Sequence, residues 1–319
     1  MTLYMDLGTY ATNADRELLK QVPRRVAAYY LALPLAREEG RVTVVTAYPE
    51  NAAALKVLER LLDARIVPVA GSELALQEAI ARIYPAGAPA AQAILAWTDD
   101  AAWREAVITT ARAFGCALNC GVHILDGALP AAEVMAAAQR PEFSLLVTHA
   151  ADEARRRWLV RRSPTSLLLV RGQHTPIDNM LVTLRGYASD REALDRVRPL
   201  IAREQAGATI LPLARTASAR PADLLPAEDS PVRQHLHAFV RQLSATDAAV
   251  AVRLRPGDPA SQVVAELAQG GPYGLLVVAA EAEGDFVGHV LARLEREGVW
   301  PERPILIVKP PVNPAETTD

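Results

Sequence analysis

The 319-residue sequence has little of several features that would assign it to a class at once. It holds two cysteines, only 5% aromatic residues and a formal net charge of −3. Two cysteines cannot form the disulfide framework of a small secreted protein, and a near-neutral charge gives no basic surface for nucleic acid. No apolar run reaches the about 18 residues of a membrane-spanning helix, and the first residues lack a secretory signal pattern. We therefore expect a cytoplasmic protein that neither binds nucleic acid nor spans a membrane.

The two cysteines, Cys116 and Cys120, lie in the segment CALNCGVHI, whose apolar residues alternate as in a β-strand. Residues four apart on a strand point to the same side but lie about 13 Å apart, which is too far for a disulfide. His123 would face the opposite side of such a strand. We therefore interpret both cysteines as core thiols and not as a disulfide or a metal site.

The chain is longer than one usual hydrophobic core supports, and its patterns divide it into three parts. Residues 13–85 give helix, hairpin around the turn REEGR, helix, strand and helix, which predicts a small α+β domain over residues 1–88. Linker-like segments at 85–91 and 172–178 precede two regions, 89–174 and 175–319, in which strands and helices alternate. This alternation predicts parallel sheets with crossover helices, so we expect an α/β fold preceded by the small domain.

Two helix ends are predicted from local signals. The helix that contains Trp103 and Phe114 should stop at Gly115, because glycine often ends helices. A later helix should begin at Ser189, which has Glu192 at the spacing of a capping box.

The regions 89–174 and 175–319 form an imperfect internal repeat and are called the first and second copy below. The segment DGALPAAEVMAAA of the first copy aligns with PGDPASQVVAEL of the second, and SPTSLLLVRG aligns with PERPILIVKP. The first copy lacks the second strand and its helix. Two copies of one fold predict an internal pseudo-dimer within the chain.

The segments GDPASQVVAELA and YGLLVVAA and a final P-x-L-x-V strand resemble the universal stress protein family. The resemblance implies two tandem domains with the parallel sheet of the adenine-nucleotide alpha-hydrolase type. In this family the final strand commonly pairs antiparallel with its counterpart in a partner. We therefore predict that residues 166–170 and 305–308 pair within one chain, and we leave a homodimer open.

Residues 20–85 separately resemble the N-terminal domain of type II secretion and type IV pilus ATPases, through the pattern LALPL…GRVTVV…P…AL…L. Some relatives of that domain bind cyclic dinucleotides through an RLG segment near the N-terminus. This sequence has no such segment and no Walker motif, so neither cyclic-dinucleotide binding nor ATPase activity is predicted.

The universal stress protein resemblance also implies where a nucleotide would bind. In ATP-binding members an acidic residue follows the first strand, and a G-x-x-G loop followed by G-[ST] holds the phosphates on backbone amides. In the second copy Arg185 stands in place of the acid, and Gly288 and His289 stand in place of G-[ST] after a shortened loop. The residues that the resemblance places at the site are Leu184, Arg185, Gly186, Gly257, Ala279, Gly284, Gly288 and His289.

Carboxylates fill much of that loop. Glu281, Glu283 and Asp285 would repel a polyphosphate, and the corresponding segment of the first copy, THAADEARRRWLVRR, has no glycine. The three acids alternate and could bind Mg²⁺ or Ca²⁺, but a solvated acidic loop is the better interpretation. His235 and His237 should point to different sides of a helix, which argues against a metal pair. We predict no metal and no cofactor, with ATP or AMP as the alternative.

The sequence offers no ordered set of nucleophile, base and oxyanion donor, so we predict that the protein is not an enzyme. The favoured hypothesis is a universal-stress-like regulatory protein that acts through an unidentified protein partner or a small ligand, with a degenerate nucleotide site. The alternative is a switch that binds ATP or AMP in the second copy.

Overall fold

The computed structural model describes residues 16–22, 26–27, 30–84, 93–150, 152–173, 176–213, 231–243, 249–269, 271, 273–280, 285–299 and 302–309. The chain divides into two compact units, one within residues 1–89 and one that starts at residue 90. The predicted linker at 85–91 lies outside the described residues. Among the residues that are described, no helix is both long and apolar enough to cross a membrane.

The N-terminal unit is a three-stranded mixed sheet with helices. It contains α2 (Arg16–Gln21), β1 (Ala32–Glu38), β2 (Arg41–Thr46), α4 (Ala52–Leu62), β3 (Arg65–Ala70) and α5 (Glu73–Ile83). The strand order is β1-β2-β3, with β1 antiparallel and β3 parallel to β2. Glu39 and Gly40 both have positive φ, 48° and 75°, which is the geometry of a tight hairpin turn. The predicted hairpin around REEGR is confirmed.

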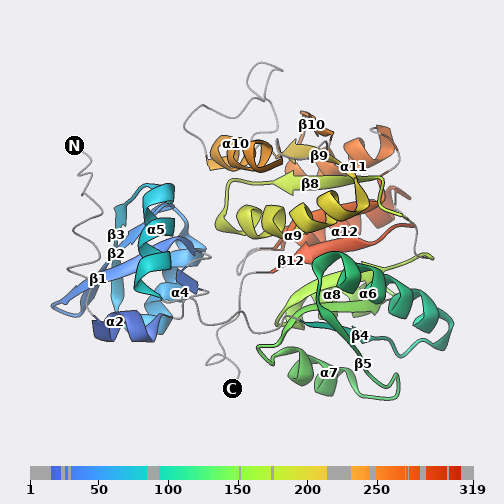
Figure 1. Cartoon of the computed structure of the whole chain (residues 1–319), viewed down its shortest axis with the longest axis horizontal. Coiled ribbons are helices and arrows are strands. Elements are labelled where there is room, and N and C mark those ends of the chain that lie inside the picture. Colours follow the sequence, from blue (N-terminus) through green and yellow to red (C-terminus); the bar gives the residue numbers. More distant parts are fainter. Residues whose placement is uncertain are drawn as a thin grey trace. The chain divides into compact units, whose positions relative to one another are not determined.

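The second unit is a nine-stranded sheet between two helical layers (Figure 1). Its elements are β4 (Ala93–Trp97), the short helix η1 (Ala101–Trp103), α6 (Arg104–Leu118), β5 (Gly121–Ile124), α7 (Ala131–Ala138), β6 (Phe143–His149), α8 (Glu153–Arg162), β7 (Ser166–Val170), β8 (Asn179–Leu184), α9 (Ala188–Glu204), β9 (Gly207–Pro212), α10 (Pro231–Leu243), β10 (Val250–Val252), α11 (Pro259–Gln269), β11 (Leu275–Ala279), α12 (Phe286–Arg296) and β12 (Ile305–Val308).

The sheet order is β10-β9-β8-β11-β12-β7-β6-β4-β5, and every neighbouring pair is parallel except β12 with β7. Central strands such as β7 and β11 are buried at every residue. Continuous apolar runs are expected for parallel strands that are covered on both faces. The predicted fold class, two tandem parallel-sheet domains of the universal stress type after a small α+β domain, is confirmed.

Two hydrophobic clusters fill the spaces between the sheet and the helices. One cluster joins α6, α9 and α10 to one face of the sheet, through side chains such as Phe114, Val197 and Phe239. The other joins α7, α8, α11 and α12 to the opposite face. Successive strand residues alternate between the clusters, so Leu145 and Leu146 belong to different ones. Each cluster contains residues of both copies, so each cluster continues across the junction between the copies.

The junction between the copies is the antiparallel pair β7 and β12. Leu168 lies opposite Leu306, and the flanking residues pair in the same register. The prediction that 166–170 and 305–308 pair within one chain is therefore confirmed. A partly buried ion pair also crosses the junction, because the guanidinium of Arg156 in α8 lies 2.7 Å from the half-exposed carboxylate of Glu295 in α12. The Arg156 side chain is only 2% exposed and also donates to the Ala150 carbonyl oxygen at 3.2 Å.

The first copy has one strand fewer than the second. Its order is β7-β6-β4-β5, against β12-β11-β8-β9-β10 in the second copy. The sequence predicts that the first copy lacks the second strand and its helix. Among the described elements it does have one strand and one helix fewer, but by position the strand without a counterpart is the edge strand β10 and not the second strand. The short strand β5 lies directly beside β4, in the place that β9 has beside β8.

Two predicted helix boundaries are wrong. Helix α6 passes through Gly115 and ends at Leu118, because Asn119 takes the left-handed conformation (φ 53°) that Asn tolerates better than most residues. Cys116 is thus helical, and the strand expected over CALNCGVHI starts only at Gly121. Helix α9 begins at Ala188, and its capping box uses Tyr187 and Asp190 instead of Ser189 and Glu192. His235 is buried and His237 exposed, as predicted for opposite helix sides.

Candidate functional site

The candidate site lies at the carboxyl edge of the second copy, where β8 and β11 end side by side. The chain leaves these neighbouring strands in opposite directions, because β8 leads to β9 and β11 leads to β12. Open α/β sheets usually bind ligands at such a switch point. Leu184 and Ala279 end the two strands and are buried. Gly284 lies outside the described residues, as do Glu281 and Glu283.

The loop after β8 wraps around a buried carboxylate. The backbone N–H groups of Arg185, Gly186 and Tyr187 all donate to Oδ2 of Asp190, at 2.8, 2.6 and 3.3 Å. Gly186 permits this curvature with a φ of 84°. Asp190 is fully buried, and Nδ1 of His235 lies 3.7 Å from the same oxygen. Converging amides of this kind form an anion site, and here the chain's own carboxylate occupies it.

Arg185 occupies the position at which the family resemblance places an acid. Its guanidinium carbon lies 4.8 Å from the ring centre of Tyr187 and 4.3 Å from that of Phe286. A guanidinium over aromatic faces is stabilised by the ring quadrupoles. Phe286 is the first residue of α12, so Arg185 joins the β8 loop to the start of that helix. The structure thus brings the loop after β8 and the start of α12 together, as predicted for the two parts of the site. The Arg185 side chain lies between them.

The start of α12 holds a second carboxylate. Asp285 is the N-cap residue, and its carboxylate lies so close to Gly288 that a Cβ at that position would collide with it. Oδ2 of Asp285 is 3.3 Å from the guanidinium of Arg161, which belongs to α8 of the first copy. Negative charge is favoured at a helix N-terminus. The position that would attract a phosphate therefore already carries a carboxylate, while His289 is exposed.

Gly257 belongs to the cap of α11. It has a φ of 110°, and its carbonyl oxygen accepts from Gln262 at 2.6 Å. The following Asp258 accepts from the Ser261 hydroxyl and backbone, and these bonds hold the pKa of its carboxyl below the usual range. Arg293 of α12 lies 3.5 Å from Asp258. These contacts link Gly257 to α12, and its positive φ serves the turn.

The first copy has an equivalent edge that the sequence interpretation missed. Arg155, in the first turn of α8, donates to Asp99 at 2.8 Å, and Asp99 follows β4. The same guanidinium lies 5.3 Å from the ring centre of Trp97 and 5.7 Å from that of Trp158. The sequence signal for this edge is the pair of acids Asp99 and Asp100, which follow the strand AILAW after Thr98.

His149 ends β6 on this edge and is 4% exposed. Its Nδ1 lies 2.8 Å from the Val170 carbonyl oxygen, and its ring stacks on Trp103 with centroids 4.1 Å apart. Nδ1 donates in this bond, since a carbonyl oxygen can only accept. The ring is thus held by β7, one of the two junction strands, on one side and by η1 on the other.

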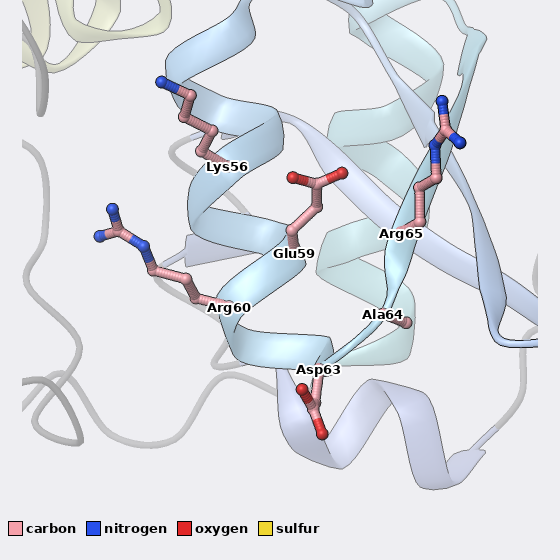
Figure 2. A pocket seen from close by; sticks show the side chains of 6 residues that line it. All are labelled: Lys56, Glu59, Arg60, Asp63, Ala64 and Arg65. Carbon is pink, nitrogen blue, oxygen red and sulfur yellow. The ribbon is translucent and has the colours of Figure 1, made fainter.

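The N-terminal unit has an open depression of about 460 Å³ between α4 and the start of β3 (Figure 2). Lys56, Arg60 and Arg65 line it, together with Glu59 and Asp63. Oε1 of Glu59 accepts from the backbone N–H of Ile66 at 3.3 Å, so this carboxylate ties the helix to the strand. Mixed charges of this kind suit a polar partner better than an apolar ligand.

No group of three or more metal-ligating side chains occurs in the described ranges. This finding covers neither Glu281 nor Glu283, so the prediction about an acidic loop without a metal stays a prediction.

Residues 9–90 match the MshEN domain. The structure of MshE with cdg is 21% identical, covers 26% of this chain with a TM-score of 0.24, and is itself covered over 59% of its length. The chain therefore spans little more than half of that protein. This match agrees with the predicted resemblance of the N-terminal domain.

Universal stress proteins are the structural neighbours of the rest of the chain, as the sequence resemblance predicts. One, solved in complex with cAMP, is 25% identical over 43% of this chain and 99% of its own, with a TM-score of 0.33. Another, from Archaeoglobus fulgidus DSM 4304, is 11% identical over 86% of this chain and 99% of its own, with a TM-score of 0.44. No curated protein sequence matches the chain.

Proposed function

We propose that this is a non-enzymatic regulatory protein of the universal stress type whose nucleotide site is degenerate and which acts by binding another protein. The N-terminal MshEN-like unit would supply a second contact surface. The protein would work in the cytoplasm. The observation that carries the proposal is the filled edge of the second copy, where Asp190, Arg185 and Asp285 already occupy the anion nest, the aromatic contact and the helix N-terminus.

A bound nucleotide would have to displace these groups. Asp190 accepts three backbone hydrogen bonds, and each bond to a charged group contributes about 1.5–3 kcal/mol. A polyphosphate at the α12 N-terminus would also meet the Asp285 carboxylate, and like charges about 4 Å apart repel by about 4 kcal/mol near a protein surface. These costs exceed what a few new contacts return, which favours a site that no longer binds nucleotides.

Titration calorimetry and thermal unfolding with ATP, AMP and cAMP test the proposal. Stabilisation grows as RT ln(1 + [L]/Kd), so about 5 mM ligand with a Kd near 5 mM contributes only about 0.4 kcal/mol. We expect melting shifts below about 2 °C for all three nucleotides. A Kd of about 10 μM would instead contribute nearly 4 kcal/mol and shift the melting temperature on the order of 10 °C.

Micromolar binding that is lost on bulky substitution at Gly186 or Gly288 would replace this proposal with the nucleotide switch. Arg140→Gln is the matched control, because Arg140 is exposed at the end of α7 in the other copy. A cyclic dinucleotide belongs in the same panel. Binding that is lost on changing Arg60 and Arg65 would assign a ligand to the depression in Figure 2 and leave the second copy as proposed.

A further inference from the structure

An open pocket of about 520 Å³ lies away from the filled edges and contains both cysteines of the chain. The end of α6, the start of β5 and the end of α9 form it. Helices α6 and α9 belong to different copies and pack against each other, so the pocket lies on the junction between the copies. Its volume falls within the about 300–1,000 Å³ that is usual for small-molecule sites.

The end of α6 places the two thiols at one pocket. The helix closes with Asn119 in the left-handed conformation, and the backbone N–H of Cys120 donates back to the Gly115 carbonyl oxygen at 2.9 Å. This reversal brings Cys120 beside the last helical turn, which carries Cys116. The separation of about 13 Å expected for a strand therefore does not apply. Cys116 is exposed, so its interpretation as a core thiol is wrong, while Cys120 is partly exposed; both are free thiols.

The pocket is electropositive. The guanidinium of Arg203 donates to Sγ of Cys116 at 2.9 Å. Arg112 precedes Cys116 by one helical turn on the same face of α6 and lines the same pocket. No carboxylate occurs among the described residues that line it. Reactive cysteines are found in partly exposed, electropositive surroundings of this kind.

The guanidinium of Arg203 is a full positive charge in direct contact with the Cys116 sulfur, so the pocket presents positive charge at the place where a small disulfide would approach.

We propose that Cys116 is a site of S-thiolation by small disulfides that carry carboxylates, with Arg112 and Arg203 binding those carboxylates. The Cys116 sulfur, as thiolate, attacks one sulfur of the disulfide, whose S–S bond breaks as the new one forms. The other half leaves as a thiolate and takes up the proton that Cys116 released. The small disulfide is itself the oxidant, so no further reagent is required.

Cys120 does not complete an internal disulfide in this scheme. Burial raises the pKa of the Cys120 thiol, which keeps it protonated and slow to attack. The mixed disulfide on Cys116 therefore accumulates and is reversed by a reducing thiol.

Intact-mass analysis and peptide mapping of the full chain test the proposal. Oxidised glutathione is the charged probe and hydroxyethyl disulfide the neutral one, each normalised to its rate with a free small thiol. We expect one adduct per chain, on Cys116, and about a tenfold preference for the charged probe over the neutral one. Cys116→Ser abolishes the adduct, and Cys120→Ser keeps both its position and its rate.

The arginine variants separate binding from general reactivity. Arg112→Gln should slow the glutathione reaction about fivefold and leave the neutral reaction within about twofold, while Arg112→Lys keeps most of the charged rate. Arg140→Gln, on the exposed end of α7, should change neither. An adduct on Cys120, an internal disulfide, equal normalised rates for the two probes, or no adduct would each overturn the proposal.

Discussion

At the carboxyl edge of each copy an arginine side chain lies near aromatic rings, but the arginine comes from a different part of the fold in each copy. In the first copy, Arg155 comes from helix α8, stacks near Trp97 and Trp158 and pairs with the half-exposed Asp99. In the second copy, Arg185 comes from the loop after β8 and lies over Tyr187 and Phe286.

The two edges differ most in the carboxylate. Asp99 is 54% exposed and bonds to one side chain, whereas Asp190 is fully buried and accepts from three backbone N–H groups. Water can therefore replace the contact between Arg155 and Asp99 at the first edge. At the second edge we expect the hydrogen bonds to Asp190 to stabilise the fold. The same position is therefore filled by a solvated side-chain pair in the first copy and by a carboxylate held within the fold in the second.

The largest expected effect breaks this contrast directly. Asp190→Ala should lower the free energy of unfolding by about 3 kcal/mol, because three partly buried N–H donors lose their buried acceptor. Asp99→Ala should cost less than about 1 kcal/mol, since its pair is solvated. Urea unfolding of both variants measures the difference. Equal losses would show that the nest around Asp190 is no more important to the fold than a surface pair.

The junction gives the next largest effect. Arg156→Ala should lower the free energy of unfolding by about 2–4 kcal/mol, because a buried guanidinium is lost and the Ala150 carbonyl is left without it. Its neighbour Arg157 forms only an exposed pair with Glu153, so Arg157→Ala should change stability by no more than about 0.5 kcal/mol. A loss as small for Arg156 as for Arg157 would mean that the ion pair does not hold the copies together.

The residues that follow the paired strands differ in their response to pH. Lys309 follows β12 and donates to the Ser163 carbonyl oxygen at 2.7 Å, and burial lowers its pKa to about 8. Arg171 stands at the matching position after β7. Between pH 8 and the ordinary lysine pKa of 10.5, the unfolded chain binds a proton that the folded chain does not, so stability rises with pH in this window.

The free energy of unfolding of the unaltered protein, minus that of Lys309→Met, should rise on the order of 1 kcal/mol from pH 8 to 10, after allowance for solvent screening. Lys309→Arg stays charged and should show no such rise. Denaturant unfolding at several pH values gives the three curves. If the difference in free energy of unfolding between the unaltered protein and Lys309→Met does not change with pH, the amine of Lys309 is not buried as described.

The smallest expected effect is a null result. Replacing Glu281, Glu283 and Asp285 by Ser removes the repulsion but leaves Arg185 and Asp190 in place, so about 5 mM ATP should still shift the melting temperature by less than about 2 °C. Gain of micromolar affinity in this variant would show that charge alone had closed the site.

The sheet and the junction could be predicted because buried parallel strands are continuous apolar runs. SLLLV and ILIV carry this signal, and both are buried at every residue. The end of α6 could not be predicted in the same way. Short apolar segments such as GCALNC fit a helix and a strand equally well, and the left-handed turn at Asn119 decided between them.

The sequence names candidate site residues but not their contacts. The family resemblance points to Arg185, yet its aromatic partner Phe286 lies 101 positions along the chain and no local pattern joins them. Asp190 escaped notice because its partners are backbone amides, which every sequence has. Its role depends on the path of the loop, and that path is a property of the folded chain.

The antiparallel pair β7 and β12 has a further consequence. Two identical subunits that meet across a twofold axis must carry the same residues on both sides, so every substitution appears twice. Here the two sides are encoded separately, and their place in one chain keeps them at an effective concentration above that of free subunits. Each side can then change alone without losing the interface, which is a physical basis for one copy losing a strand while the other kept all five.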